Sequence, residues 1–449
     1  MPKQLWIWSI TAALAGFLFG FDTVVISGAD QQLQDLWQSS DLFHGLVVMA
    51  MALWGTVVGA LVGGYPTNKY GRKTTLIWIG VLYTVSAIGC AVVSDPYSFA
   101  FFRFVGGLGV GASTIAAPAY ISEIAPRAHR GKLVGLYQFN IVFGILVAFF
   151  SNYLLSGIGE GAWRWMLGIE AVPAIAYTFF AMTIPRSPRW LIMQGRFDEA
   201  RQVLMLADPK RDIDAAFAQM KGEIDEEAKA GDVTIFDKRF RFILMLAFFI
   251  AFFNQMSGIN AILYYAPRIF QEAGLGESTA LLSSIGVGAV NMIATGIGVY
   301  LIDRVGRKTL MYIGSIGYIF SLTMVALAFG LGWGGLWVPF FLFFFIASHA
   351  IGQGTVIWVF ISEIFPNRLR GYGQSFGSSV HWLLAAAVPA FIPVAFGTIG
   401  PAAVFAIFAA TMVLQLLFVA FMMPETKGVS LEDLARQLIG KDARKAAIA

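Results

Sequence analysis

The heptapeptide YGRKTTL (residues 70–76) recurs 235 residues later as VGRKTLM (305–311). A second pair follows the same rule, since YISEIAPRAHRGK (120–132) recurs 240 residues later as FISEIFPNRLRGY (360–372). In each half, the first loop follows the second apolar segment and the other loop follows the fourth. An internal repeat of this kind predicts two similar structural halves, a common plan for transporters whose substrate binds between the halves.

The segments between these loops are strongly apolar. Of the 449 residues, 57% are hydrophobic and only 13% are charged, whereas a water-soluble protein has about 25% charged residues. Each long apolar run could cross a hydrocarbon layer of about 30 Å as a helix. We therefore predict an all-α membrane protein with twelve transmembrane helices in two pseudo-symmetric six-helix bundles. The predicted spans are 6–28, 43–65, 74–94, 97–122, 131–154, 163–184, 240–270, 278–302, 309–331, 335–362, 371–396 and 400–423.

Polar intervals give the predicted domain boundaries. We expect an N-terminal bundle at 1–185 and a C-terminal bundle at 240–423. Residues 186–239 alternate charged and apolar positions at helical spacing, which predicts two or three short amphipathic helices on the cytoplasmic side. Residues 424–449 should form a short polar cytoplasmic tail.

The positive charges indicate how the chain is oriented. With Met1 inside, 28 of the 31 Lys and Arg residues lie in the predicted cytoplasmic segments. This asymmetry predicts that both termini are cytoplasmic. The first span is too long for a cleaved signal and lacks a small-residue cleavage site, so we expect a multi-pass plasma membrane protein. No continuous basic face is visible, and nucleic acid is therefore not an expected partner.

Enzymatic chemistry has little support in the sequence. We find no nucleophile–base pairing, no metal-ligand cluster and no phosphate-binding glycine loop with its expected flanks. The segment GVGAV (286–290) lies inside a span and is typical of helix packing. A single cysteine, Cys90, excludes a disulfide framework and a thiolate metal site. We expect neither an enzyme nor a bound cofactor or metal.

Several motifs make the chain resemble the sugar porter family of the major facilitator superfamily. The repeated glycine–arginine–lysine loops mark the superfamily, whereas PRSPRWL (185–191) together with PETKG (424–428) marks sugar porters. Further matches are IDRVGRK (302–308), NQMSGINAILYY (254–265) and GQGTVIW (352–358). The resemblance covers nearly the whole chain. It implies import of a hexose or pentose, either proton-driven or facilitated, by a monomer surrounded by lipid in a bacterial inner membrane.

Amide and aromatic side chains suit a sugar, because amides both donate and accept hydrogen bonds and aromatic faces pack on C–H surfaces. Buried amides are costly in hydrocarbon and therefore face a cavity or another helix. Gly258 would let the seventh helix unwind, so that Asn254 and Asn260 converge. Any single amide could instead only link helices, and we assign Asn140 to that class. These arguments and the family's pattern give the predicted sugar-binding residues, which are Phe19, Gln138, Ile141, Asn254, Gln255, Asn260, Tyr264, Asn291, His349, Gly354, Trp358, His381 and Trp382.

Four positions near the predicted sugar site depart from the family's pattern. Asn254 is one methylene shorter than the usual glutamine, and Thr355 replaces a common proline. His349 stands where many members have an aromatic residue, and His381 where many have Gln or Asn. A lone membrane histidine is often structural, but the neighbouring Trp382 favours sugar contact for His381. These departures leave the identity of the sugar open.

The segment FLFGFDTVVISG (17–28) places one acid, Asp22, inside the first span. An ionised carboxylate is costly there without a partner, and Arg103 is the only Lys or Arg that lies well inside a predicted span rather than at its ends. In sugar porters that couple to protons, an aspartate and an arginine stand at these two places, whereas facilitators commonly have asparagine for the acid. We predict that Asp22 carries the proton, with Arg103 as its partner and Glu170 as a further relay. A purely structural ion pair is the alternative.

Charged residues of the repeated loops are predicted to form a cytoplasmic gate. In the family, the gate is held by charge pairs and helix dipoles. The second repeat carries Asp303 where the first has Asn68, so we expect a less symmetric gate. The predicted gate residues are Arg72, Glu123, Arg130, Asp303, Arg307, Glu363 and Arg370.

Three functions stay open on the sequence alone. The favoured one is a proton–monosaccharide symporter that works by alternating access. The first alternative is a facilitative uniporter, in which the ion pair of Asp22 and Arg103 is only structural. The second alternative is a non-transporting sugar sensor. The short polar tail at 424–449 argues against a sensor, because sensors of this kind tend to carry long cytoplasmic signalling tails.

Overall fold

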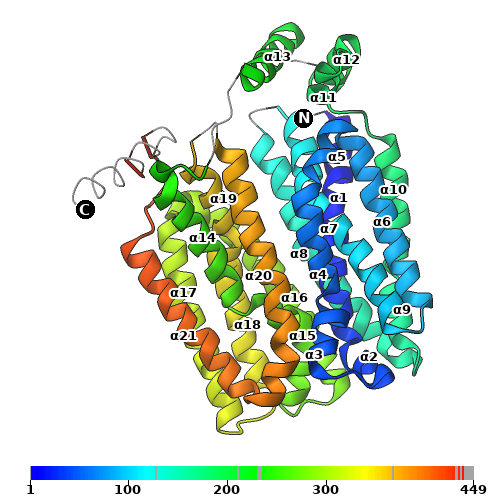
Figure 1. Ribbon diagram of the computed structural model, residues 1–449, viewed down its shortest axis with the longest axis vertical. Helices are drawn as coiled ribbons and strands as arrows, with labels where there is room; N and C mark the ends of the chain where they lie inside the picture. Colours follow the sequence, from blue (N-terminus) through cyan, green and yellow to red (C-terminus); the bar gives the residue numbers. More distant parts are fainter. Residues whose placement is uncertain are drawn as a thin grey trace. The chain divides into compact units, whose positions relative to one another are not determined.

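The computed structural model describes residues 2–126, 129–209, 212–229, 235–366, 369–429, 433–434 and 437–438. Every regular element in these ranges is a helix, as Figure 1 shows. Among the helices of these ranges, eleven are long and apolar enough to cross a membrane. A bent pair, Asp41–Met49 with Met51–Val62, makes a twelfth span if it is counted as one, with a bend of 42°. The predicted all-α membrane fold is confirmed.

The chain divides into two compact units. The first unit comprises Met1–Ala29 and Met51–Gly231, and the second comprises Asp30–Ala50 and Asp232–Ala449. Asp30–Ala50, the short segment after the first span, therefore belongs to the same compact unit as the second half of the chain. The six-helix bundles at 1–185 and 240–423 stay predictions.

Small residues bring the helices of the first unit into contact. A Cβ atom on Gly20 would overlap the backbone of Ile141, and one on Gly144 would overlap the backbone of Phe17. Helices α1 and α8 can therefore pack only with glycine at these positions, which is how membrane helices approach closely. The helices of this unit are α1 (Lys3–Val25), η1 (Ile26–Gly28), α4 (Met51–Val62), α5 (Gly64–Lys69), α6 (Arg72–Val92), α7 (Pro96–Ile124), α8 (Arg130–Leu155), η3 (Ser156–Ile158), α9 (Ala162–Gly168), α10 (Ala171–Thr183), α11 (Pro188–Met193), α12 (Phe197–Ala207) and α13 (Ile213–Lys229).

Local caps fix where these helices begin. The Asp95 carboxylate accepts hydrogen bonds from the backbone N–H groups of Ser98 at 2.9 Å and Tyr97 at 3.0 Å, and Pro96 occupies the first helical position of α7. This arrangement satisfies N–H groups that have no partner within the helix. The hydrogen bonds from Ser98 hold the pKa of Asp95 below its usual value. Helix α7 therefore starts at Pro96, which places Arg103 two turns inside.

The polar insert forms the predicted short helices. Helices α11, α12 and α13 share a small apolar cluster that includes Leu191, Ala200, Leu204 and Phe217. Helices α11 and α12 are too short to be stable alone in water, so the shared cluster provides the stabilisation that helix propensity lacks.

The second unit contains a helix broken at its centre. Gly258 has φ of +83°, and it separates α14 from α15. A second irregularity is the π-helical turn η5, which separates α18 from α19. The helices of this unit are α2 (Asp30–Trp37), α3 (Asp41–Phe43), η2 (His44–Met49), η4 (Lys238–Phe240), α14 (Arg241–Met256), α15 (Ile259–Glu272), α16 (Glu277–Val305), α17 (Arg307–Gly330), α18 (Trp337–His349), η5 (Ala350–Gly354), α19 (Thr355–Ile364), α20 (Arg370–Thr398) and α21 (Gly400–Phe421).

We predict that Gly258→Ala destabilises the protein. A Cβ atom there would lie 2.6 Å from the ring of Phe408, and the left-handed backbone adds about 1–2 kcal/mol of strain. The control is Gly296→Ala in α16, where a Cβ atom meets open space and alanine favours the helix by about 0.5–1 kcal/mol. Thermal unfolding in detergent should show a lower Tm for the first variant and no loss for the second. Equal Tm values would contradict the required break.

Candidate functional site

A buried ion pair joins α1 to α7 in the first unit. Nη1 of Arg103 donates to Oδ1 of Asp22 at 2.6 Å, and Nη2 donates to the backbone carbonyl of Asp22 at 3.1 Å. Each residue is 1% exposed. A buried pair of this kind adds little net stability, because desolvation of both charges offsets their attraction. Loss of one partner would leave the other charge uncompensated, which makes the pair a sensitive point in the fold.

Glu170 completes this group of charges. It precedes α10, is 2% exposed, and its carboxyl group lies close enough to Asp22 and Arg103 for their charges to interact. Two buried carboxylates that interact in this way repel each other, which favours a proton on one of them. Within the described part of the chain, Oε1 of Glu170 is buried without a hydrogen-bond partner. The structure therefore brings together the three residues predicted for proton coupling and offers a buried place for one proton.

The predicted sugar-binding residues of the first unit lie on α1 and α8. Phe19 is three residues before Asp22 and packs, like Ile141, against the apolar cluster of this unit. Gln138 lies one turn before Ile141 on α8, and its side chain is half-buried. Asn140 donates to the carbonyl of Leu136 in its own helix at 2.8 Å. This bond uses the Asn140 amide locally, consistent with its separation from the predicted sugar-binding set.

The broken helix of the second unit brings two predicted amides together. Nδ2 of Asn260 donates to Oε1 of Gln255 at 2.8 Å, across the break at Gly258. Nε2 of Gln255 donates to Oδ1 of Asn254 at 2.9 Å and lies 3.3 Å from both ring nitrogens of His381. All three amide residues are buried. This cluster can offer a ligand both donors and acceptors.

Two tryptophans surround His381 beside this cluster. The ring centroid of His381 lies 4.9 Å from that of Trp358 and 4.9 Å from that of Trp382. Trp358 comes from α19, whereas His381 and Trp382 come from α20. The aromatic faces and the Gln255 amide are therefore neighbours, a combination that suits a ring with both C–H and hydroxyl groups.

Four other predicted sugar-binding residues belong to the second unit. Nδ1 of His349 is 2.7 Å from the hydroxyl of Tyr318, and its ring stacks on Phe345. His349 thus has a local partner on α17, and Gly354 packs against it. The remaining two predicted residues, Tyr264 on α15 and Asn291 on α16, are buried in the same unit.

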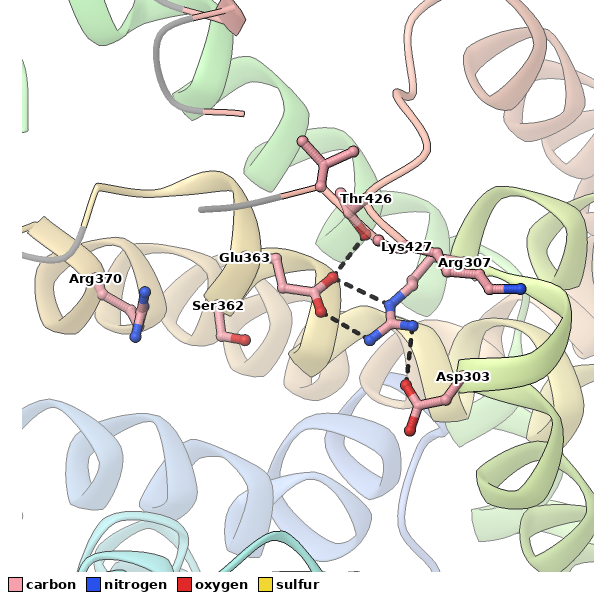
Figure 2. Close-up of a pocket in the computed structure, with 9 residues that line it drawn as sticks. Asp303, Arg307, Ser362, Glu363, Arg370, Thr426 and Lys427 are labelled. Atoms are coloured by element: carbon pink, nitrogen blue, oxygen red, sulfur yellow. Dashed lines mark hydrogen bonds and ion pairs between the residues drawn. The ribbon is translucent and has the colours of Figure 1, made fainter. Parts of the chain in front are cut away.

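A charged network stands at the loop between α16 and α17 (Figure 2). Arg307 donates to both carboxylate oxygens of Glu363, at 3.1 and 2.7 Å, and to Oδ1 of Asp303 at 3.0 Å. Thr426 donates its hydroxyl to Oε2 of Glu363 at 2.6 Å. These residues line a cavity of about 560 Å³, together with Ser362, Arg370, Lys427, Gly428 and Val429.

Glu425 caps the first turn of α17 in the same network. Its carboxylate accepts from the backbone N–H groups of Arg307 and Lys308, each at 3.0 Å. Partial burial raises the pKa of Glu425, but hydrogen bonds from Lys427, Arg307, Lys308 and Thr426 hold it below the usual value. An anion at a helix N-terminus is favourable. The sequence interpretation treated PETKG only as a family mark and missed this role, although an acid beside a helix start was the available signal.

The first unit repeats the arginine–glutamate pair but with fewer partners. Arg72 donates to Oε1 of Glu123 at 3.0 Å, and Ser187 hydrogen-bonds to the other carboxylate oxygen. Nη1 of Arg72 donates to the carbonyl of Thr67 at 3.1 Å, as Nη1 of Arg307 does to that of Ile302 at 3.1 Å. Arg307 has Asp303 in addition, and the first repeat has Asn68 at that place. Of the remaining predicted gate residues, Arg130 is exposed at the start of α8 and Arg370 is half-buried at the start of α20.

We predict that Asn68→Asp stabilises the outward-open state. The new carboxylate would give Arg72 the acceptor that Asp303 gives Arg307, and so strengthen the predicted cytoplasmic gate. The matched variant Asp303→Asn removes that acceptor from the second unit and should act in the opposite direction. Single cysteines labelled from each side of the membrane would report the change. Unaltered labelling in Asn68→Asp would show that the asymmetry does not affect the gate.

Comparisons with known proteins agree with this fold and these motifs. The family model described as "Sugar (and other) transporter" matches residues 8–438. The arabinose-proton symporter of Bacillus subtilis is 34% identical over 435 residues, which cover 95% of this chain and 94% of the relative. The glucose transporter GlcP of Staphylococcus epidermidis is 34% identical over 441 residues, 98% of each chain. The inward-open structure of the xylose transporter XylE from E. coli superposes with a TM-score of 0.86 at 30% identity, covering 96% of this chain and 99% of that one.

Proposed function

Because the chain belongs to the sugar (and other) transporter family, we propose that it imports a monosaccharide together with a proton. It is a multi-pass membrane transporter and not an enzyme. Relatives named for arabinose, glucose and xylose support a pentose or hexose as the substrate. The observation that carries the coupling proposal is the buried group of Asp22, Arg103 and Glu170.

In the proposed mechanism, the proton controls the ion pair. Ionised Asp22 attracts Arg103, so α1 and α7 are held together by charge. Protonation neutralises Asp22 and removes most of that attraction. Glu170 can hold or pass the proton, since its buried carboxyl group interacts with the charge of Asp22. The loaded carrier changes state with Asp22 neutral, and the empty carrier returns only after the proton leaves.

We propose that the sugar is bound by amides and aromatic faces in each unit. In the second unit, Gln255 and Asn260 would bond sugar hydroxyls while Trp358 and Trp382 pack on the C–H face. In the first unit, Gln138 would supply another amide. The remaining predicted sugar-binding residues keep the same proposed role.

Localisation and assembly belong to the same proposal. We propose that both termini face the cytoplasm, on the basis of the Lys and Arg asymmetry among the loops. We further propose that the carrier acts as a monomer in a bacterial inner membrane, with surrounding lipid as a partner. Labelling of single cysteines placed in the tail and in the segment around Arg164 would test the orientation.

We predict that Gln138→Ala and Gln255→Ala weaken sugar binding. A buried hydroxyl that loses its partner costs about 1–3 kcal/mol, which raises Kd roughly ten-fold or more. Asn140→Ala is the control, because its amide bonds only within its own helix. Isothermal titration of purified carrier with glucose, xylose and arabinose would measure the effect. If both glutamine variants bind like wild type, these residues belong to packing.

We predict that Asp22→Asn separates exchange from accumulation. Asparagine mimics the protonated carboxyl permanently, so the variant should bind sugar and exchange it across the membrane. It should not concentrate sugar when a pH difference is imposed, because it has no proton to release. Counterflow and proton-driven uptake would be measured in the same proteoliposomes, so that intact counterflow serves as the folding control.

The alternatives give different results in these assays. A facilitative uniporter would show counterflow in the wild type but no accumulation under a pH difference. A sugar sensor would bind sugar without counterflow. Accumulation by Asp22→Asn with a proton gradient as its only driving force would refute the coupling role of this aspartate.

A further inference from the structure

We infer that Gln353, Gln415 and Ser315 are positioning residues, which fix the orientation of the Gln255 amide and thereby the carrier's preference among sugar hydroxyls. The inference rests on the proposed function, in which Gln255 and Asn260 bind sugar. None of the three residues was among the predicted sugar-binding residues. They lie on η5, α21 and α17, and each is 0% exposed.

A continuous chain of hydrogen bonds connects these residues to the amide cluster. Nδ2 of Asn254 donates to Oε1 of Gln353 at 3.5 Å, the longest link. Nε2 of Gln353 donates to Oε1 of Gln415 at 3.0 Å, and Nε2 of Gln415 donates to Oγ of Ser315 at 2.8 Å. With the bonds from Asn260 to Gln255 and from Gln255 to Asn254, the chain runs from the broken helix to α17.

Backbone carbonyls set the direction of every link. The Ser315 hydroxyl donates its only hydrogen to the carbonyl of Met311 at 2.7 Å, so toward Gln415 it can only accept. Gln415 must therefore turn its NH₂ to Ser315 and its oxygen to Gln353. Nε2 of Gln353 also reaches the carbonyl of Ile250, at 3.4 Å, and this longer, weaker contact favours the same orientation without fixing it alone.

The orientation is passed on to the sugar-binding amide. Asn254 must turn its NH₂ to Gln353 and its oxygen to Gln255. Gln255 then turns its NH₂ to Asn254 and His381, and its oxygen to Asn260. Only Oε1 of Gln255 has a free lone pair, so toward a sugar hydroxyl this residue is an acceptor. A flipped amide would place two N–H groups against each other inside the protein, which is costly.

Local structure explains how a glutamine in the tenth span reaches this chain. Gln353 lies between Gly352 and Gly354, within the π-helical turn η5. A π-turn inserts an extra residue and rotates the side chains that follow, and such turns are frequent at functional sites. Gly352 also packs closely on Gly314 of α17, so η5 lies directly against the helix that carries Ser315.

The test compares variants that remove a link with a matched control. Gln415→Leu removes the hydrogen bonds to Gln353 and to Ser315 while keeping a side chain of similar volume. Ser315→Ala removes only the last acceptor, and it serves as the smaller change in case Gln415→Leu impairs folding. Ser321→Ala is the control, because Ser321 is also 0% exposed on α17 and donates to its own helix at 2.7 Å, without contact to this chain of amides. Binding is measured for glucose, xylose and arabinose, and then for monodeoxyfluoro analogues of the sugar bound most tightly.

A fluorine accepts but does not donate, so wild type should discriminate against the analogue fluorinated at the hydroxyl that donates to Gln255. Gln415→Leu should raise Kd for the parent sugar about three- to ten-fold. It should also reduce the discrimination against that analogue by a similar factor, because the released amide can turn an N–H group to fluorine. Ser315→Ala should act in the same direction, and Ser321→Ala should stay within two-fold of wild type.

The double variant Gln255→Ala with Gln415→Leu tests whether Gln415 affects sugar binding through Gln255. If Gln415 acts through Gln255, Gln415→Leu should have no further effect once Gln255 is alanine. Additive effects, or unchanged analogue discrimination in both Gln415→Leu and Ser315→Ala, would overturn the inference. If Gln255→Ala itself leaves Kd unchanged, the sugar role of Gln255 fails and the inference fails with it. A large effect of Gln255→Ala beside a neutral Gln415→Leu would contradict the inference alone.

Discussion

The ion pair between Asp22 and Arg103 is the constraint on which the rest of the structure depends. Two charges are held in a bundle built for lipid, where each would be costly alone. The glycines of α7 let neighbouring helices approach and keep water away from the pair, since Gly107 and Gly111 meet the backbone of α4 directly. Burial raises the desolvation cost of the ion pair, and it also means that protonation of Asp22 has a large effect on the interaction between the helices. A proton that neutralises Asp22 changes the forces between helices as well as the charge of one residue.

In the second unit, the buried polar groups that need partners are neutral amides. A bilayer offers no water to an amide, so each buried amide must find a protein partner. Asn254, Gln255, Gln353 and Gln415 solve this by bonding to one another and ending on Ser315. The helix break at Gly258 lies beside these amides and lets Asn260 hydrogen-bond to Gln255 across it. Polar groups are thus concentrated where a sugar would need them.

Much of this could be predicted from the sequence, because bilayer thickness fixes span length and the repeat fixes the plan. The broken helix at Gly258 and the partner of Asp22 were also predictable, from one glycine and from the one arginine that lies well inside a span rather than at its ends. The bend that divides the second predicted span was not, since the π-turn at His44–Met49 has no marker in its sequence. The roles of Gln353 and Gln415 were missed because their partners lie 62 or more residues away along the chain. The available signal was an amide within an otherwise apolar segment, such as Gln415 in the last span.

The most direct measurement of coupling is proton movement driven by sugar alone. Proteoliposomes with a trapped pH-sensitive dye and no initial pH difference would receive an inward gradient of a transported sugar. The buried carboxyl group predicts that the lumen acidifies as sugar enters, and that a protonophore abolishes the signal while sugar entry continues. Sugar entry at the same rate with no acidification would contradict a carrier whose turnover requires a proton on Asp22.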